Sequence, residues 1–598
     1  MPVIDRRSLD FLLFDWLRMT ELLDRSRFAD HDRESIAAII SLAEKLSEDL
    51  IAPYLRSADS EEPWLDSDGQ VHVLPEVARA VRATGEAGLF SSVFDADRGG
   101  LQLPYLVHMA AMGVLMSGSI SIASFMLLTV ANARLIATFG SPAQAQAFAE
   151  PQIEGKACGT MCLSEPHAGS SLADITTRAE RDGEDALGQR YLLFGSKMWI
   201  SAGDHDAVDD IFHLVLARAD GASTGLSLFI VPKRLPSGER NDITVSGLNH
   251  KMGYRGIPNC ALTFGGGAHR PAGRDGAVGW LVGELGQGLR QMFQMMNEAR
   301  VSVGLGGAIL ACRGFQLSCA YASERLQGRL PGRRDGGQVP IVEHADVQRM
   351  LLAQKAYAEG ALSLVLYTAR LLDVAATGQP REREDAEALL AVLTPIAKTW
   401  PSEWAQQSLS LAIQIHGGAG YTRDFDVELL YRDNRLNPIH EGTTGVQGID
   451  LVGRKLRRDG GSALRLLIAS VRATIERARS RPALRTDARA VADAWTAVEG
   501  AADWLLACED DSPAVALATP FLFAMGHAVV AWLWLDQAVT CDRLLEESRP
   551  DRELLEGKLV ACHYFCTAEL PKVPAWLAPY ADPPPYLALL RSDIFRPT

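Results

Sequence analysis

The chain has 598 residues, 47% of them apolar, so it can bury a large core and should form several domains. Lysine and arginine number 59 against 74 aspartate and glutamate, which gives a formal net charge of −15. These values exclude a largely disordered chain and argue against a nucleic acid as the main partner.

The N-terminal part is predicted to be helical. Residues 1–34 form an extension whose first residues are too polar, and whose apolar run at 11–14 is too short, for a signal peptide. From Asp30 to about Phe148 apolar residues recur three and four apart, as in Ile36, Ile40 and Ala43. The pattern predicts an N-terminal α-helical domain over residues 35–156.

The pattern changes at Ala157. Short runs rich in strand formers, such as residues 190–194, 211–216 and 226–231, are separated by Gly, Asp and Pro. Several such runs with no helical segment between them predict a middle domain over residues 157–285, built as an antiparallel β-barrel or sandwich.

Helices return after Gly288. Periodic runs at 289–326, 344–377 and 384–415 predict a four-helix-bundle domain over residues 286–460, followed by an appended C-terminal helical domain over residues 461–598. The fold class is therefore α+β multidomain. The apolar stretch 513–535 is long enough to span a membrane, but its interruptions and neighbours favour a buried bundle helix with at most peripheral membrane contact.

The nine cysteines show no spacing typical of a disulfide framework. Cys562, His563 and Cys566 stand close together, but their order differs from a haem attachment motif and a zinc site needs further ligands. We therefore expect no metal, and we expect a cytoplasmic protein.

Two segments at the start of the predicted β-domain suit a cofactor. Residues 161–171, MCLSEPHAGSS, run from a strand into a tight turn that presents hydroxyls and main-chain amides, although an ordinary strand-end loop has the same composition. Residues 195–203, GSKMWISAG, place Trp199 and Ser201 on the same face of a strand, where a flat ring could pack.

Three further segments lie in the predicted bundle and are weak or moderate signals alone. Residues 295–300, MMNEAR, open a long helix, and residues 323–329, SERLQGR, end it with basic groups that also suit the helix dipole. Residues 414–421, QIHGGAGY, bring a helix end to a glycine-rich turn, which permits close approach of a cofactor or simply caps the helix.

A sixth segment makes a family resemblance specific. Residues 431–447 read YRDNRLNPIHEGTTGVQ and contain Glu441 before a predicted helix start near Thr443. Taken in order, the six segments resemble the acyl-CoA dehydrogenase family over residues 35–457, including the α, β, α succession. The chain is similar to the longer bacterial members, such as the 3-methylmercaptopropionyl-CoA dehydrogenases, which also carry an extra C-terminal helical domain.

The resemblance implies FAD as the cofactor. It places the isoalloxazine ring between the 161–164 strand end and Trp199, and it implies that residues near Arg325 and Gln414 reach the FAD of a neighbouring subunit, hence a homodimer or larger homo-oligomer. The implied cofactor-binding residues are Met161, Leu163, Ser164, Gly169, Ser170, Trp199, Ile200, Ser201, Arg325, Gln327, Gln414, Gly417, Gly418, Thr443 and Gly445. Many relatives have a polar residue where Gly445 stands, so we expect that side-chain contact to be absent.

The resemblance also implies that Glu441 is the catalytic base. It would remove the α-proton of an acyl-CoA thioester while a hydride leaves the β-carbon for flavin N5, which desaturates the α,β-bond. The implied substrate-binding residues are Ser170, Asn297, Arg300 and Gly442. Two departures from the family pattern are Asn297, where relatives often have Asp, and His440, where many have Tyr.

Two alternatives stay open. The chain could be an acyl-CoA oxidase that returns electrons to oxygen instead of using electron-transfer flavoprotein or a similar acceptor. It could also be a flavin-binding homologue that associates with DNA and has little dehydrogenase activity, although the acidic charge and Glu441 speak against this. Chain length and branching of the acyl group, and the part played by the C-terminal domain in acyl-CoA catabolism, do not follow from the sequence.

Overall fold

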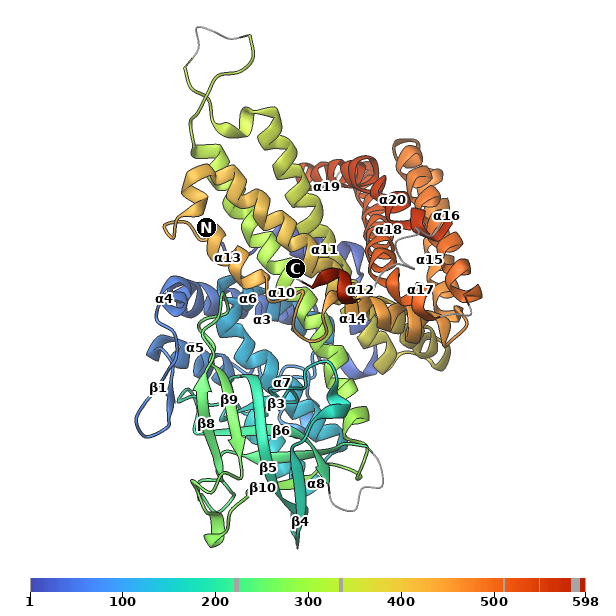
Figure 1. Cartoon of the computed structure of the whole chain (residues 1–598). Helices are drawn as coiled ribbons and strands as arrows, with labels where there is room; N and C mark the ends of the chain where they lie inside the picture. The colour runs from blue at the N-terminus through green and yellow to red at the C-terminus, as the bar shows by residue number, and fades with distance from the viewer. Residues whose placement is uncertain are drawn as a thin grey trace. The chain divides into compact units, whose positions relative to one another are not determined.

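The computed structural model of the protein describes residues 2–219, 225–332, 337–508, 511–547, 549–581 and 592–596. The chain divides into two compact units (Figure 1), one formed by Met1–Ile4 and Ser26–Ser302 and the other by Asp5–Arg25 and Val303–Thr598. Most of the N-terminal extension therefore belongs to the second unit. The division falls inside one long helix, α10 (Gly288–Glu324).

The first unit opens with the predicted helical domain. Its first long helix is fixed by a capping box, in which the Asp32 carboxylate accepts from the Ser35 amide and the Ser35 hydroxyl accepts from the Asp32 amide. Ile36, Ile40 and Ala43 are buried, as their spacing predicts. The helices are α3 (Arg33–Leu46), α4 (Leu55–Ser60), α5 (Pro75–Glu86), α6 (Tyr105–Gly118), α7 (Ile120–Phe139), α8 (Pro142–Gln144) and α9 (Glu150–Ile153), with a short unpredicted hairpin of β1 (Trp64–Leu65) and β2 (Val71–His72).

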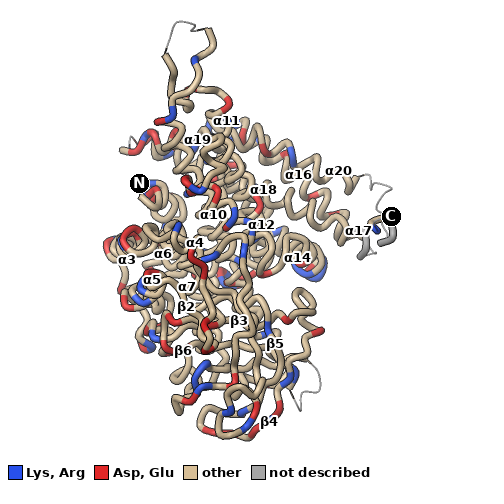
Figure 2. Tube along the Cα trace, turned by 60° about the vertical axis from the view of Figure 1, so that its left-hand side comes forward, with Lys and Arg blue, Asp and Glu red and all other residues tan. Residues whose placement is uncertain are grey.

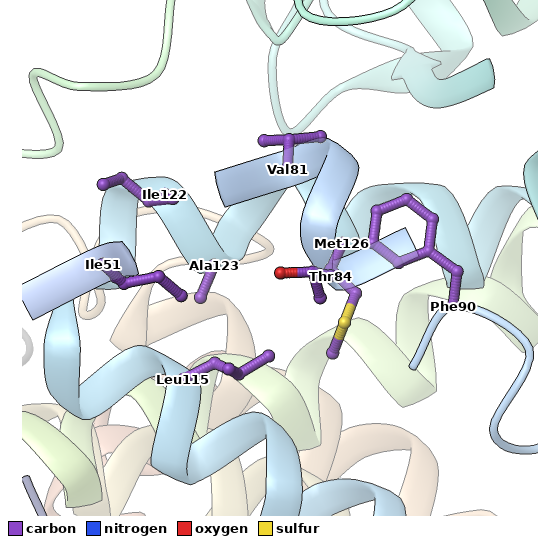
Figure 3. A pocket seen from close by; sticks show the side chains of 8 residues that line it. All are labelled: Ile51, Val81, Thr84, Phe90, Leu115, Ile122, Ala123 and Met126. Atoms are coloured by element: carbon purple, nitrogen blue, oxygen red, sulfur yellow. The ribbon is translucent and has the colours of Figure 1, made fainter. Parts of the chain in front are cut away.

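A small cavity lies between the helices of this domain (Figure 3). Its volume is about 10 Å³, enough for a single water molecule at most. The one hydroxyl in its lining, Thr84 Oγ1, already donates to the Ala80 carbonyl at 2.8 Å. The cavity is lined by Ile51, Val81, Thr84, Phe90, Leu115, Ile122, Ala123 and Met126. It is therefore a packing void and is too small to hold an acyl group.

The rest of the first unit is a β-barrel followed by the first part of α10. Strand β10 pairs with both β7 and β5, so the ring β10, β7, β6, β4 and β5 closes, and β9 and β8 extend from β5. The strands are β3 (Ala157–Cys162), β4 (Arg178–Asp185), β5 (Gly188–Ser201), β6 (Asp210–Ala219), β7 (Ser227–Pro232), β8 (Ile243–Leu248), β9 (Asn259–Phe264) and β10 (Ala277–Leu281). The barrel is confirmed, but the expectation of a wholly antiparallel sheet is wrong: β3 and β4 each pair with β6 in parallel. Because the β4–β5 hairpin separates β3 from β6 along the chain, β3 can enter beside β6 in the same direction.

Long antiparallel helices form the bundle of the second unit. Besides α10, they are α11 (Ala345–Thr377) and α12 (Pro380–His416), followed by the short helices α13 (Val427–Asn434) and α14 (Thr444–Ile449). Pro401 inside α12 cannot donate to the Ala397 carbonyl, and Gly304 of α10 lies against that oxygen. A Cβ at Gly304 would stand 1.9 Å from it, so only glycine permits this approach.

The appended domain contains α15 (Ser462–Arg479), α16 (Arg485–Ala507), α17 (Asp511–Ala516), α18 (Ala518–Glu546), α19 (Arg552–Tyr564) and α20 (Lys572–Ala581). Helix α18 packs on the bundle, where Trp400 donates to His527 Nδ1 at 2.9 Å. The N-terminal helices α1 (Arg6–Asp10) and α2 (Met19–Leu23) also join this unit. Lys558 of α19 links α1 to α11, since it donates both to the Ser8 hydroxyl at 3.2 Å and to Glu359 of α11 at 2.9 Å.

Among the residues that the structure describes, four helices are long and apolar enough to cross a membrane by length and composition alone. They are α7, α10, α11 and α18, and between 61% and 83% of the apolar window of each is buried inside the protein. Burial within the fold accounts for their hydropathy, as in the core helices of large bundles.

Candidate functional site

In the first unit, the loop after β3 is held by a buried ion pair. Lys197 of β5 contacts a Glu165 oxygen at 3.0 Å and donates to the Leu163 carbonyl at 3.0 Å. Both side chains are almost fully buried. The Glu165 carboxylate also accepts from the amides and hydroxyls of Thr176 and Thr177, at distances from 2.6 to 3.0 Å. The loop is thus pinned at both of its ends.

These donors determine the charge state of Glu165. Burial raises the pKa of the carboxyl, but the hydrogen bonds from Thr177 and Thr176 and the ammonium of Lys197 outweigh it and lower the pKa to about 2. Glu165 is therefore ionised at neutral pH, and its oxygens are occupied by internal donors. It organises the loop and is not positioned to act as a base.

The part of this loop predicted to bind the cofactor keeps free main-chain donors. Ser164 accepts from the Met198 amide at 3.0 Å, whereas the amides of Leu163 and Ser164 have no acceptor among the described residues. Met161, Leu163 and Ser164 are half-buried, while Gly169 and Ser170 are exposed. The strand end can therefore offer N–H groups to the polar edge of a ring.

Trp199 lies beside this loop. Regular alternation along β5 does not place it there, because the strand is irregular at this point. The register of β5 against β9 shifts between Lys197 and Ile200, and Trp199 has a left-handed φ of 66°. This bulge turns the indole outward, so that 60% of the residue is exposed, and leaves Ser201 half-buried. The side chain of Ile200 lies in the barrel core, so only its main chain can face a cofactor.

The predicted substrate residues of α10 lie at its start. Asn297 is exposed, whereas Arg300 is buried and its Nη1 lies 3.5 Å from Asn297 Oδ1. Between them, Glu298 accepts from Arg134 of α7 at 2.9 Å. Burial raises the pKa of Glu298, and the Arg134 guanidinium opposes this shift. Arg300 is thus held within the fold rather than being the solvated helix charge that its type alone indicates.

In the second unit, Glu441 occupies a strained turn. Its φ is 54°, in the left-handed region, and Gly442 follows with a φ of 95°. This conformation costs a residue with a side chain about 1–3 kcal/mol and persists only where neighbours enforce it. Thr443 then caps α14, its hydroxyl accepting from the Val446 amide at 3.4 Å. Glu441 therefore stands directly before a helix N-terminus.

Gln447 and helix α12 hold this turn. Gln447 Nε2 donates to the Glu441 carbonyl at 3.1 Å, and Thr444 donates to Glu403 of α12. On the other side, the buried Lys398 of α12 donates to the Asn437 carbonyl at 2.7 Å, and Asn434 donates to the Ser402 carbonyl at 3.0 Å. The segment that carries Glu441 is thus tied to α12 both before and after that residue.

His440, one of the two departures from the family pattern, is neutral. Burial of the ring and the nearby Lys398 ammonium lower the pKa of His440 to about 3. An uncharged imidazole precedes Glu441 at neutral pH, so His440 adds no positive charge beside the Glu441 carboxylate.

The remaining predicted cofactor residues of the second unit are on its surface. Arg325 and Gln327 are exposed on either side of Leu326, which forms an isolated β-bridge with Pro340. The Gln327 amide donates to the Val339 carbonyl, and the Ile341 amide donates to the Arg325 carbonyl. Gln414, Gly417 and Gly418 are exposed at the end of α12, and Tyr321 stacks on His416 between the two helix ends. The exposed Thr443 and half-buried Gly445 lie at the start of α14.

Within each unit the structure brings predicted residues together. The 161–164 strand end and the 199–201 bulge meet in the first unit, and Glu441, Gly442, Thr443 and Gly445 share one turn in the second. Sequence reasoning assigned no role to Glu165, Lys197, Lys398 or Gln447. The only signal for Lys197 and Lys398 was a charged residue inside a strand or helix pattern, whereas Glu165 in a polar loop and the uncharged Gln447 gave no such signal.

Comparison with known proteins covers most of the chain. The family descriptions that match are "Acyl-CoA dehydrogenase, N-terminal domain" at residues 34–156, "Acyl-CoA dehydrogenase, middle domain" at 160–266, "Acyl-CoA dehydrogenase, C-terminal domain" at 286–456 and "Acetyl-CoA dehydrogenase C-terminal like" at 467–583.

Individual proteins match over most of their length. The chain is 35% identical to 3-methylmercaptopropionyl-CoA dehydrogenase of Ruegeria pomeroyi, over 87% of this chain and 89% of that protein. It is 32% identical to a broad-specificity linear acyl-CoA dehydrogenase of Mycobacterium tuberculosis, over 94% and 95%. Its fold is similar to that of an acyl-CoA dehydrogenase from Bacillus anthracis solved with FAD, with a TM-score of 0.73 and 21% identity over 95% of this chain and 90% of that one.

Proposed function

Because the chain belongs to the acyl-CoA dehydrogenase family, we propose that it desaturates the α,β-bond of an acyl-CoA thioester with Glu441 as the base and FAD as its cofactor. The observation that carries this proposal is the turn at Glu441. Glu441 has a left-handed backbone conformation just before the N-terminus of α14, and hydrogen bonds on both sides of the residue enforce that conformation.

The residues of the first unit fit FAD. The amides of Leu163 and Ser164 are available as donors, the exposed indole of Trp199 offers a flat face, and the Glu165 carboxylate is neutralised by Lys197. We assign the ring to this strand end, with Met161, Ile200 and Ser201 contributing from the same elements. When bound, FAD supplies the acceptor for the two electrons removed from the acyl group.

Glu441 would take the proton from the carbon next to the thioester carbonyl. Proton removal from that carbon needs a base within hydrogen-bond reach, and a rigid turn lowers the cost of aligning it. The neutral His440 precedes the base, and Lys398 acts on the main chain at Asn437. Asn297 and Arg300 lie on α10, where we propose that they contact the acyl-CoA.

We further propose a cytoplasmic homo-oligomer that passes electrons to electron-transfer flavoprotein or a similar acceptor. The exposed Arg325, Gln327 and Gln414 to Gly418 turn are available to a second copy. An oxidase would instead give stoichiometric peroxide in air. A DNA-associated role gains no support from the net charge of −15 or from the acidic and basic residues interspersed along the trace (Figure 2).

The test is anaerobic visible spectroscopy of the purified protein during addition of short, medium, long and methylthio acyl-CoAs. We expect bleaching of the oxidised-flavin band by at least one class, which would also define the acyl group. A flavin-loaded protein that none of these thioesters bleaches would contradict the proposal.

A further inference from the structure

Gln447 is placed to control the main chain on which Glu441 stands. Its side chain is fully buried, and Nε2 lies 3.1 Å from the Glu441 carbonyl oxygen and, more weakly, 3.5 Å from that of Gly442. Carbonyl oxygens only accept, so the amide nitrogen of Gln447 must face them. One neutral side chain therefore orients the two peptide groups on either side of Gly442.

The close approach of the Gln447 side chain is a second reason why position 442 requires glycine. Besides its φ of 95°, a Cβ on Gly442 would stand 2.6 Å from Gln447 Nε2. A larger residue would displace the glutamine amide from the two carbonyls. The conformation of the turn and the position of Gln447 are thus mutually dependent.

The next residue along α14 rests on the C-terminal domain. Gly448 lies against the first turn of α18, where a Cβ would stand 3.0 Å from the carbonyl carbon and oxygen of Ala518 and 3.1 Å from the Thr519 amide. Main chain meets main chain at this point, so α14 has little freedom to shift. The backbone of α18 thereby fixes the helix from which Gln447 reaches back to the base.

We propose that Gln447 is a positioning residue for Glu441, and that the C-terminal domain fixes the base through the contact of Gly448 with α18. The proposal rests on the proposed function. It assigns to the appended domain a part in catalysis. The domain supports the turn at Glu441 through α14, without touching the reacting atoms.

The first experiment compares Gln447→Leu with Gln354→Leu. Gln354 of α11 is also fully buried, and its amide has no hydrogen-bond partner among the described residues, so the control makes the same substitution without losing a bond. In single-turnover flavin reduction with saturating acyl-CoA, we expect Gln447→Leu to be slower by about 100-fold with FAD retained and a raised α-deuterium isotope effect, since a misplacement of about 1 Å costs roughly that factor. Gln354→Leu should keep the wild-type rate and isotope effect.

A second pair tests the support from α18. Gly448→Ala places a methyl group against Ala518, whereas Gly453→Ala lies on the same helical segment with no atom within 4 Å of its Cβ. We expect flavin reduction about 10-fold slower for Gly448→Ala, an order-of-magnitude estimate for a shift smaller than 1 Å, and no change for Gly453→Ala. This pair also decides the matter if Gln447→Leu does not fold.

The outcomes separate this proposal from the proposed function. If wild-type enzyme is reduced by acyl-CoA, and flavin-loaded Gln447→Leu and Gly448→Ala are reduced equally fast with an unchanged isotope effect, the positioning role is wrong while the dehydrogenase assignment stands. If no acyl-CoA reduces the wild-type flavin, the proposed function itself fails, and the positioning role fails with it.

Discussion

The proposed cofactor loop of the first unit (residues 163–177) and the proposed base turn of the second (residues 440–443) are each held by a fully buried lysine from another element, but the lysines have different partners. Lys197 meets the Glu165 carboxylate inside the barrel, whereas Lys398 donates to the main-chain carbonyl of Asn437. At the Glu441 turn, Asn434 and Gln447 contribute neutral amides, and Thr444 donates to the Glu403 carboxylate. The loop after β3 is thus fixed by a direct pairing of opposite charges. Each of the bonds named here for the Glu441 turn instead includes an uncharged group, either a main-chain carbonyl or a hydroxyl.

The largest effect should come from breaking the ion pair. We expect Lys197→Met to lower the free energy of unfolding of the first unit by about 3 kcal/mol, because it removes a buried counter-charge from Glu165. The protein should also lose FAD on gel filtration. Stability is measured by urea denaturation, with Lys156→Met as the control variant because Lys156 forms an exposed ion pair with Glu154. The free energy of unfolding of this control should change by less than about 0.5 kcal/mol. Equal stability of the two variants would refute the role given to Lys197.

A smaller effect is expected at the base turn. Lys398→Met leaves the buried Asn437 carbonyl without its donor, at a cost of about 1–3 kcal/mol. Here FAD should be retained while flavin reduction by acyl-CoA slows. Stopped-flow reduction and a flavin absorbance ratio measure the two properties separately. Loss of FAD with an unchanged rate in the remaining holoenzyme would reverse the comparison between the two regions.

Acid should act on the cofactor loop through Glu165. Its pKa falls from 4.5 in the unfolded chain to about 2 in the folded protein, so its contribution to stability is present above pH 4.5 and is lost as the pH falls toward 2. The difference in unfolding free energy between wild type and Glu165→Gln should therefore shrink on acidification below pH 4.5. A difference that stays constant down to pH 2.5 would show that the carboxylate charge is irrelevant.

The smallest effect concerns the unpredicted hairpin. Hydrogen bonds to Asp66 and then to Asp206 raise the pKa of His72, so its contribution is complete below pH 6.5 and is lost as the pH rises through the higher folded value. Hydrogen exchange of the β1–β2 amides should become slightly faster above that range, relative to the intrinsic rate, in wild type but not in His72→Gln. The same pH profile in both proteins would rule out this anchor.

Sequence patterns predicted the helices and strands that are specified by the spacing of apolar residues within a single segment. The spacing of Ile36, Ile40 and Ala43 gave α3, and the order of helical and strand-rich regions gave the fold class. The parallel pairing of β3 with β6 and the bulge that turns out Trp199 depend on strands distant in sequence, so no local pattern contains them. The braces from Gln447 and Lys398 were missed for a similar reason, since each bonds to a main-chain carbonyl that carries no sequence signal.

The most direct test of the account is single-turnover flavin reduction by wild type and Glu441→Gln, each with one bound FAD, using the acyl-CoA that bleaches the wild type. The substitution keeps size and hydrogen-bonding capacity but cannot accept the α-proton, so we expect reduction slower by at least about 100-fold, the lower end of what a positioned base contributes, with unchanged FAD content. Reduction of the Glu441→Gln flavin at the wild-type rate would contradict the assignment of Glu441 as the base.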